Sequence, residues 1–375
     1  MTNSSVDLVV VLREMKKLIG FSFVLALPIF IWIMAKPTTS EKISYISNPN
    51  LETISAPPEW KGTPIDEKER FVNLYHPFES SFADLLKWQT SKNPYKEEKE
   101  SENRTLIVDF DPEDLLGEED YMLWLGHATY LLRLSGQVIL IDPILIDNTF
   151  LKRDSKLPFP IEELPPLDFI MISHNHRDHC DKQTIQFLSK QHPKAKFLTG
   201  LGLKKVIKSW TEGQEIQEAG WYQQYQIDKT AINITYVPSR HWSKRWLWDD
   251  NKSLWGGFYF QTPQQKIYFM GDSGKGPHFE DIKNTLGAPD FCLMGVGAFR
   301  PEWFMNQSHI SPTDAIDAFN VMEGKFFIPM HFGTFDLSDE PRMEPWDILV
   351  EHSELIQGQL IEPMIGQNLL KSEGQ

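Results

Sequence analysis

FIMISHNHRDH, residues 169–179, is a short apolar run followed at once by three histidines and one aspartate. The apolar residues predict a buried strand over 169–173 that ends where the histidines begin. Imidazole and carboxylate groups at this density are costly to bury without a partner, so a solvated loop is the weaker alternative. His174 and His176 would point the same way, with Asp178 and His179 just beyond them. Such residues suit Zn²⁺, with iron or manganese as alternatives.

Three further strand ends carry the same kind of side chain. His241 closes the stretch that begins at residue 237, Asp272 follows the apolar run 267–270 through Gly271, and His331 follows the run 327–330. A single histidine at a strand end is more often an ordinary hydrogen-bonded residue. Taken with the first cluster, these three side chains supply what two metal ions would still lack.

The pattern around these motifs predicts a layered α/β domain. Short apolar runs bounded by turn residues predict strands at 122–125, 130–134, 138–142, 169–173, 196–199, 232–237, 257–261, 266–270, 291–295 and 325–330. Helices are expected at 182–191, 203–210 and 312–322, the last with Ser311 as its N-cap and Pro312 in its first turn. Two packed sheets covered by helices are the natural assembly of these elements.

Composition narrows the classes of partner. The chain has 375 residues with 37 Lys and Arg against 52 Asp and Glu, for a formal charge of −15, which argues against binding a nucleic-acid backbone. Its two cysteines, Cys180 and Cys292, form neither a disulfide framework nor a zinc knuckle. We assign both cysteines, and His127 in a predicted turn, structural roles.

The N-terminal part is predicted to hold a membrane anchor. Residues 18–35 are uncharged and apolar, and as a helix they would span roughly 27 Å, just enough for a bilayer core. Basic residues precede the segment, so positive-inside reasoning leaves the N-terminus in the cytosol and the rest of the chain on the non-cytosolic side. A cleaved signal peptide and an interfacial or buried helix are the alternatives. Residues 92–102, rich in charge, are expected to be an exposed linker.

The histidine and aspartate motifs together resemble the metallo-β-lactamase superfamily over residues 123–335. The resemblance implies an αββα four-layer sandwich. It also implies that His174, His176 and His241 hold one zinc ion, that Asp178, His179 and His331 hold a second, that Asp272 bridges both, and that Asp142 orients ligands without binding metal. We expect a tail and transmembrane anchor at 1–36, a polar neck and arm packing on the catalytic domain at 37–120, and the catalytic domain at 121–375.

Within the superfamily, the chain resembles the N-acylphosphatidylethanolamine-hydrolysing phospholipases D. Matching stretches are 70–73, 124–129, 172–176, 238–245, 249–256 and 297–305. His309 corresponds to an extra active-site histidine near the substrate phosphate, although residues 306–308 depart from the family pattern. The resemblance implies two Zn²⁺ ions and a bridging hydroxide that cleaves N-acylphosphatidylethanolamine to N-acylethanolamine and phosphatidic acid, with His309 and Asp272 as catalytic residues. Asp178 or Asp272 acting as a general base is the less favoured assignment, since both are needed as ligands.

Aromatic residues beside His241 support a lipid partner. Trp242, Trp246 and Trp248 alternate with basic residues, a composition suited to contact with substrate or membrane, although core packing also explains such rings. Expected partners are therefore a phospholipid, a membrane and a second copy of the chain as a homodimer, with no nucleic acid. Alternative functions are hydrolysis of a lactone, a sugar-phosphate lactone or a β-lactam by the same fold, or a membrane-tethered binding module without activity.

Overall fold

The computed structural model describes residues 42–54, 57, 59–79, 81–148, 151–227, 230–246 and 248–374. The chain divides into two compact units, Met1–Lys42 and Ile43–Gln375, and the second carries the helices and strands described below. The apolar segment 18–35 lies outside the described residues, so the membrane anchor stays a prediction. Within the described ranges, no helix is both long and apolar enough to cross a bilayer.

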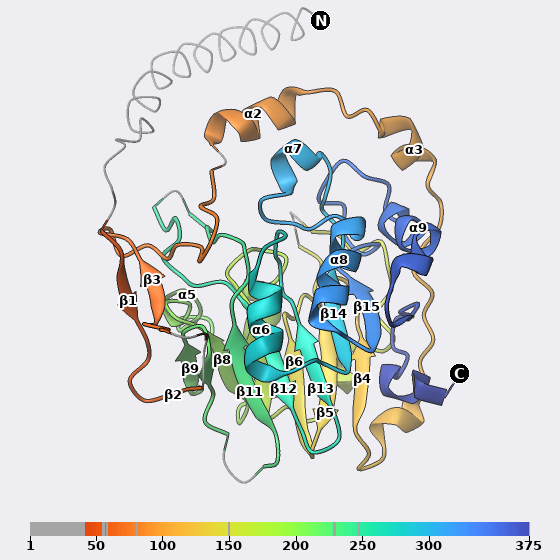
Figure 1. Cartoon of the computed structure of the whole chain (residues 1–375). Helices are drawn as coiled ribbons and strands as arrows, with labels where there is room; N and C mark the ends of the chain where they lie inside the picture. Colours follow the sequence, from red (N-terminus) through yellow and green to blue (C-terminus); the bar gives the residue numbers. More distant parts are fainter. Residues whose placement is uncertain are drawn as a thin grey trace, which may run out of the picture. The chain divides into compact units, whose positions relative to one another are not determined.

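Two sheets form the centre of the domain (Figure 1). The six-stranded sheet has the order β4 (Tyr121–Trp124), β5 (Tyr130–Leu134), β6 (Gln137–Ile141), β7 (Phe169–Ile172), β8 (Lys196–Gly200) and β9 (Ile216–Ala219). The eight-stranded sheet has the order β16 (Gln359–Leu360), β15 (Phe326–Met330), β14 (Phe291–Gly295), β13 (Lys266–Phe269), β12 (Gly257–Gln261), β11 (Asn233–Val237), β10 (Gln223–Gln224) and β2 (Glu52–Thr53). In both sheets antiparallel hairpins give way to parallel strands, β6 to β9 in one and β13 to β16 in the other.

Alternating side chains divide the two faces of each strand. In β6, Ile139 and Ile141 belong to the core between the sheets, whereas Val138 and Leu140 belong to the core on the outer face. This alternation is the two-residue period of a strand. Because both faces of the strand are buried, its sequence is a continuous run of apolar residues. The outer core also contains Ile185 of α4 (Lys182–Gln191), which places that helix against the six-stranded sheet.

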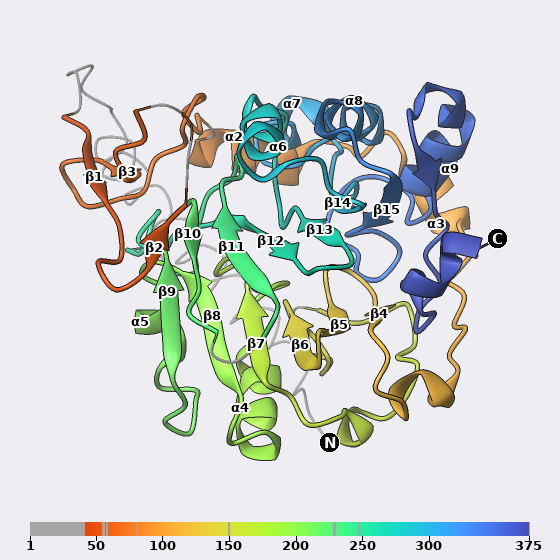
Figure 2. The same ribbon diagram turned by 60° about the horizontal axis from the view of Figure 1, so that its bottom comes forward.

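Helices on the other side complete the sandwich. α6 (His278–Leu286) and α8 (Pro312–Met322) contribute Phe279 and Phe319 to the core of the eight-stranded sheet. Figure 2 shows α4 on the side of the six-stranded sheet that faces away from α6 and α8. The predicted αββα four-layer architecture is therefore confirmed. The N-cap also forms as expected, since Ser311 Oγ accepts a hydrogen bond from the backbone N–H of Asp314 at the start of α8.

The residues before β4 form an arm that joins the catalytic domain. β1 (Ser44–Ile46) and β3 (Thr63–Ile65) pair with each other, and β2 extends the eight-stranded sheet through β10. Two short helices follow, α2 (Phe82–Thr90) and α3 (Lys96–Ser101). The expectation of an exposed linker at 92–102 was wrong in part, because α3 forms there, and its Lys99 pairs with Asp336 on the catalytic domain.

The remaining elements among the described residues are short or lie near the C-terminus. They are α5 (Lys204–Ile207), α7 (Glu302–Met305), α9 (Glu344–Glu351) and four 3₁₀ helices, η1 (Pro112–Leu115), η2 (Ile161–Glu163), η3 (Ser353–Leu355) and η4 (Leu369–Gly374). α5 is shorter than the helix expected at 203–210. Asn368 Oδ1 accepts a hydrogen bond from the backbone N–H of Met122, so the C-terminal segment covers the β4 edge of the six-stranded sheet.

Candidate metal centre

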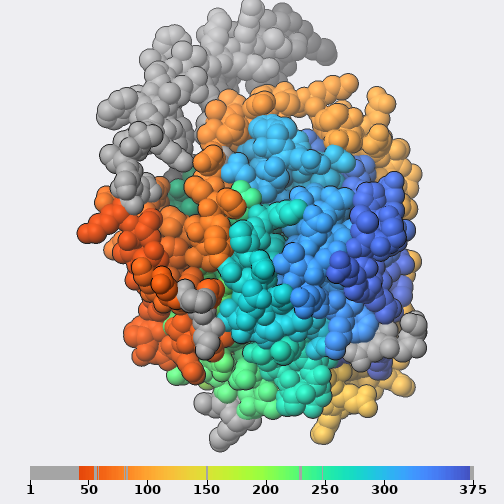
Figure 3. Space-filling model, in the orientation of Figure 1, coloured from red at the N-terminus to blue at the C-terminus, as the bar shows by residue number. Residues whose placement is uncertain are grey.

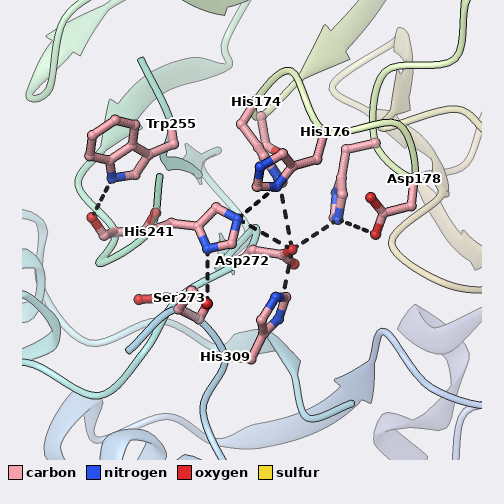
Figure 4. Close-up of polar contacts among 12 residues, drawn as sticks. His174, His176, Asp178, His241, Trp255, Asp272, Ser273 and His309 are labelled. Carbon is pink, nitrogen blue, oxygen red and sulfur yellow. Dashed lines mark hydrogen bonds and ion pairs between the residues drawn. The ribbon is translucent and has the colours of Figure 1, made fainter. Parts of the chain in front are cut away.

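The sequence-predicted ligands come from loops at the ends of parallel strands. His174 and His176 follow β7, Asp272 follows β13 and His331 follows β15, while His241 follows the antiparallel strand β11. The carboxyl ends of neighbouring parallel strands meet at one edge of a sheet, and both sheets direct this edge to the same place. Figure 4 shows the histidine rings gathered around Asp272.

The first cluster consists of three imidazole nitrogens and one carboxylate oxygen. His176 Nδ1 lies 3.0 Å from both His174 Nε2 and His241 Nε2. Asp272 Oδ2 lies 3.7 Å from each of the same two Nε2 atoms. These four ligand atoms lie within 4.8 Å of one another, and a set of nitrogen and oxygen donors at this density fits a tetrahedral metal site.

The second cluster contains the other predicted ligands. His179 Nε2 and His331 Nε2 are 3.2 Å apart, and Asp178 Oδ2 is 3.4 Å from both. Asp272 Oδ1 lies 3.2 Å from His331 Nε2. Asp272 Oδ2 also lies 3.2 Å from His179 Nε2, so the carboxylate of Asp272 contacts both clusters, as expected of a residue that would bridge two metal ions.

Hydrogen bonds behind the ligands set the orientation of their rings. Asp142, which is fully buried, accepts from His179 Nδ1 at 2.7 Å and from Ser173 Oγ at 2.5 Å. Ser173 Oγ in turn lies 2.9 Å from His174 Nδ1. Because the Nδ1 atoms of His174 and His179 make these hydrogen bonds, the Nε2 atom of each of the two rings keeps a lone pair directed at the centre. The predicted role of Asp142 as an orienting group agrees with these contacts.

The arm and the β13 loop hold His241 from behind. His241 Nδ1 donates to the carbonyl of Ser308 at 2.9 Å. Asn73 Oδ1 accepts from the backbone N–H of His241 at 3.1 Å, and Asn73 Nδ2 donates to its carbonyl at 2.9 Å. Ser273, next to Asp272, accepts from the backbone N–H of Arg240 through its Oγ at 3.0 Å, which links the two loops.

His127 is a site residue that sequence reasoning missed. It was assigned a structural role in a turn, but its Nε2 lies 3.1 Å from Asp178 Oδ2 and its ring centroid 4.0 Å from that of His331. It can therefore contribute to the second cluster, either as a ligand or by orienting Asp178. The available signal was its position, because like the other candidates it comes directly after a strand, here β4.

His309 faces the same centre from the loop before α8. Its Nδ1 lies 3.8 Å from Asp272 Oδ2, and its ring centroid is 5.2 Å from His241 and 5.4 Å from His331. The sequence resemblance thus located a histidine beside both clusters. Its side chain is 16 % exposed, whereas those of His241, His331 and Asp272 are at most 2 % exposed, so part of the ring is accessible.

Burial and charge give the ionisable groups of the centre different protonation preferences. Burial lowers the pKa of His309 to about 4 and that of His241 well below its usual range. Burial alone would raise the pKa of Asp272, but the positive charges of His179, His331 and His309 hold it well below the usual value. His331 has a pKa raised to about 9, because the charge of Asp272 outweighs burial. A bound cation would displace that proton.

Among the rings of the two clusters, His176 Nε2 and His331 Nδ1 are buried and lack a hydrogen-bond partner within the described residues. Both belong to rings whose other nitrogen points into a cluster. Unpartnered buried polar atoms are rare in folded proteins, and a site built to bind a ligand is one setting in which they occur. The chemistry of the donors and their convergence therefore fit a pair of metal ions.

Of the three tryptophans expected to contact lipid, Trp242 lies beside the first cluster. Trp242 stacks on Phe78, with centroids 5.3 Å apart, and meets the His176 ring edge-on at 4.5 Å. Trp246 and Trp248 stack on each other at 5.9 Å and are 51 % and 76 % exposed. Trp242 thus belongs to the wall of the centre, whereas the other two rings are presented to the surroundings.

Both cysteines are buried thiols, and neither belongs to a ligand cluster among the described residues. Burial raises the pKa of Cys180 to about 12, so the thiol stays protonated at neutral pH. This agrees with the structural role expected for the cysteines.

Comparisons with known proteins agree with the geometry. Residues 137–332 match the family model described as the Beta-lactamase superfamily domain. The chain is 30 % identical over 335 residues to N-acyl-phosphatidylethanolamine-hydrolyzing phospholipase D 1 of Caenorhabditis elegans, covering 85 % of this chain and 92 % of that protein. It is 33 % identical over 238 residues to the mitochondrial N-acyl-phosphatidylethanolamine-hydrolyzing phospholipase D of Saccharomyces cerevisiae, covering 60 % of this chain and 50 % of the relative.

Solved structures share the fold at lower identity. Igni18, a metallo hydrolase from Ignicoccus hospitalis, aligns with a TM-score of 0.50 and 20 % identity, covering 65 % of this chain and 96 % of that one. A possible metal-dependent hydrolase from Veillonella parvula aligns with a TM-score of 0.53 and 16 % identity, covering 68 % of this chain and 99 % of the other.

Proposed function

The chain is a metal-dependent hydrolase of the beta-lactamase superfamily, and from this premise we propose that it is a phosphodiesterase that cleaves N-acylphosphatidylethanolamine to N-acylethanolamine and phosphatidic acid. The observation that carries the proposal is the shared carboxylate of Asp272, which joins two clusters of metal ligands while His309 faces the same centre. The similarity to relatives named for this reaction supports the choice of substrate.

Zinc is the metal that we propose for both clusters, because nitrogen-rich donor sets with few carboxylates favour it. When bound, a pair of such ions lowers the pKa of a water molecule and polarises phosphoryl oxygens. The reaction joins one water oxygen to phosphorus and breaks the bond from phosphorus to the ethanolamine oxygen, which leaves as the alcohol after taking a proton.

The protein's own residues position the substrate for this exchange. Asp272 is fully engaged with both clusters, so it is a ligand rather than a general base. His309 faces the centre with a side chain that is 16 % exposed, and an imidazole N–H there can donate to a phosphoryl oxygen or to the departing oxygen. A donor aimed at developing charge contributes roughly 10²–10³ in rate.

Two variants separate these roles. We expect Asp272→Asn to lose bound metal and all turnover, because one carboxylate holds both ions. His309→Ala should keep about two ions per chain and lose roughly 10²-fold in kcat. Metal content by mass spectrometry and turnover of N-palmitoylphosphatidylethanolamine test both. Equal loss of metal in the two variants would make His309 a ligand, and cleavage of a lactone or β-lactam in place of the lipid would select an alternative substrate.

A lipid surface is the second part of the proposal. Trp246 and Trp248 offer apolar rings beside the centre, and at a formal charge of −15 attachment should rest on apolar insertion rather than on attraction to anionic lipid. Replacing both rings by serine should weaken sedimentation with phosphatidylcholine vesicles. Serine at Val350 and Leu355, which are 48 % and 54 % exposed, is the matched control. Membrane attachment through residues 18–35 stays a prediction from the sequence.

A further inference from the structure

A cavity of about 380 Å³ lies next to the second ligand cluster. The metal ligand His331 forms part of its wall. Its apolar lining is formed by Ala298, Phe332, Phe335, Leu337 and Pro345. A volume of this size falls in the range of ligand pockets, about 300–1,000 Å³. The cavity can therefore receive a part of a substrate that is already bound at the metal centre.

The arm forms the roof of this cavity. Asn93, Lys96 and Lys99 of the arm line it. The roof is fastened by Asn93 Nδ2, which donates to the carbonyl of Asp339 at 2.9 Å, and by Trp88 Nε1, which donates to Asp339 Oδ1 at 3.1 Å. Figure 3 shows the arm, in orange, lying across the blue surface formed by later residues.

The charged groups of the lining pair with one another. Lys96 and Glu100 are 3.6 Å apart, and Arg342 lies 3.6 Å from Asp154. Lys99 pairs with Asp336. Glu340 accepts from the backbone N–H groups of Ala298 and Arg300 at 2.6 and 3.1 Å. The lining has three cationic and four carboxylate side chains, so it offers no surplus positive charge for a phosphate or other anion.

The cavity and Trp242 lie beside different ligand clusters of the centre. Trp242 contacts His176 of the first cluster, whereas the cavity wall includes His331 of the second. A phosphodiester bound between Trp242 and the cavity has two organic substituents. The side of the centre that carries the tryptophans is the side proposed to face the lipid surface. The diacylglycerol side would stay with the lipid surface, and the alcohol side would point toward the cavity.

We propose that this cavity takes the N-acyl chain of the departing N-acylethanolamine, an inference that rests on the proposed function. The N-acyl chain is neutral and apolar, which matches a lining of five apolar residues in which the charged groups are paired or hydrogen-bonded. The arm residues of the roof then help to set the preference for N-acyl length.

Narrowing the cavity from either side tests this inference. Leu337→Trp fills it from the catalytic domain, and Lys96→Trp fills it from the exposed roof, where a larger side chain does not disturb the core. Leu355→Trp, at an exposed leucine outside the cavity, is the control. The substrates are N-acetyl- and N-palmitoylphosphatidylethanolamine with identical glycerol chains, and a second pair in which only the glycerol chains differ.

Both cavity variants should lower kcat/KM for the N-palmitoyl substrate at least tenfold relative to the N-acetyl substrate, and should bind N-palmitoylethanolamine more weakly. The ratio of the kcat/KM values for the two substrates that differ only in their glycerol chains should not change. An equal loss on both N-acyl substrates, or a change that follows the glycerol chains, would overturn the inference while leaving the proposed function intact. If the unaltered protein cleaves none of these lipids, the proposed function itself fails.

Discussion

Gly297→Ala is expected to remove metal from the second cluster alone. Gly297 lies between β14 and α7, and a Cβ added there would be 1.9 Å from the carbonyl oxygen of His331. Carbon and oxygen approach to about 3.3 Å, so His331 would have to move by about 1.4 Å, the difference of the two distances. The contacted atom is backbone and cannot rotate away, so the shift carries the ligand ring with it.

A displacement of this size has consequences at three levels. Overpacking costs about 1–3 kcal/mol of stability. A disturbed ligand lowers metal affinity about 10–100-fold, and a misplacement of about 1 Å lowers turnover about 10²-fold. We therefore expect about one bound ion per chain instead of two, a lower melting temperature and strongly reduced hydrolysis.

Metal titration against a chelator, with metal content measured after dialysis, is the assay. Gly117→Ala is the matched control, because its added Cβ would have its nearest neighbour at 3.7 Å, an ordinary contact. If Gly297→Ala binds two ions as tightly as the control does, His331 is not a ligand of the second ion.

Three further predictions follow from groups around the centre. Asp142→Asn replaces the carboxylate that accepts from His179 Nδ1, so affinity for the second ion should fall about 10–100-fold in the same titration, and unchanged affinity would refute the orienting role. Asn73→Ala removes both hydrogen bonds to the His241 backbone and should weaken metal binding at the first cluster. Asn73→Asp keeps the acceptor and should lose less metal affinity, and identical losses in the two variants would argue against a positioning role for these hydrogen bonds. Burial lowers the pKa of His278 to about 3 from 6.5, so the unfolded chain takes up a proton below pH 6.5 that the folded chain does not, and stability falls with pH across this window. His278→Gln should recover about 2 kcal/mol of the loss between pH 7.5 and pH 5, measured by urea unfolding, since 1.5 pKa units correspond to about 1.36 kcal/mol each; a variant as acid-sensitive as the original would contradict this.

Sequence reasoning located the ligands because each follows directly on a strand. His174, Asp272 and His331 stand at the ends of apolar runs that become parallel strands, and such ends converge by the geometry of the sheet. The four-layer architecture followed from the same runs, whose residues pack on both faces. Local patterns therefore sufficed for the layered architecture and for these three candidate ligands.

What the sequence did not reveal depends on contacts between distant segments. His127 sits at the turn of an antiparallel hairpin with φ +53°, and only the tertiary fold brings it to Asp178, 51 positions away. α3 is a charged segment whose place is fixed by pairs such as Lys99 with Asp336, 237 positions apart. β2 has two residues, too few to show any periodicity. The arm side of the cavity is built from Asn93 and α3, so the cavity could not be predicted.

The most direct test of the central claim is hydrolysis of N-palmitoylphosphatidylethanolamine in water enriched in ¹⁸O, with both products identified by mass spectrometry. Attack of water at phosphorus with loss of the alcohol predicts one ¹⁸O atom in the phosphatidic acid and none in the N-palmitoylethanolamine. Label in the alcohol or in a released fatty acid would place the cleavage at another bond. Absence of cleavage by protein that holds about two metal ions per chain would contradict the assignment as a phosphodiesterase of this lipid.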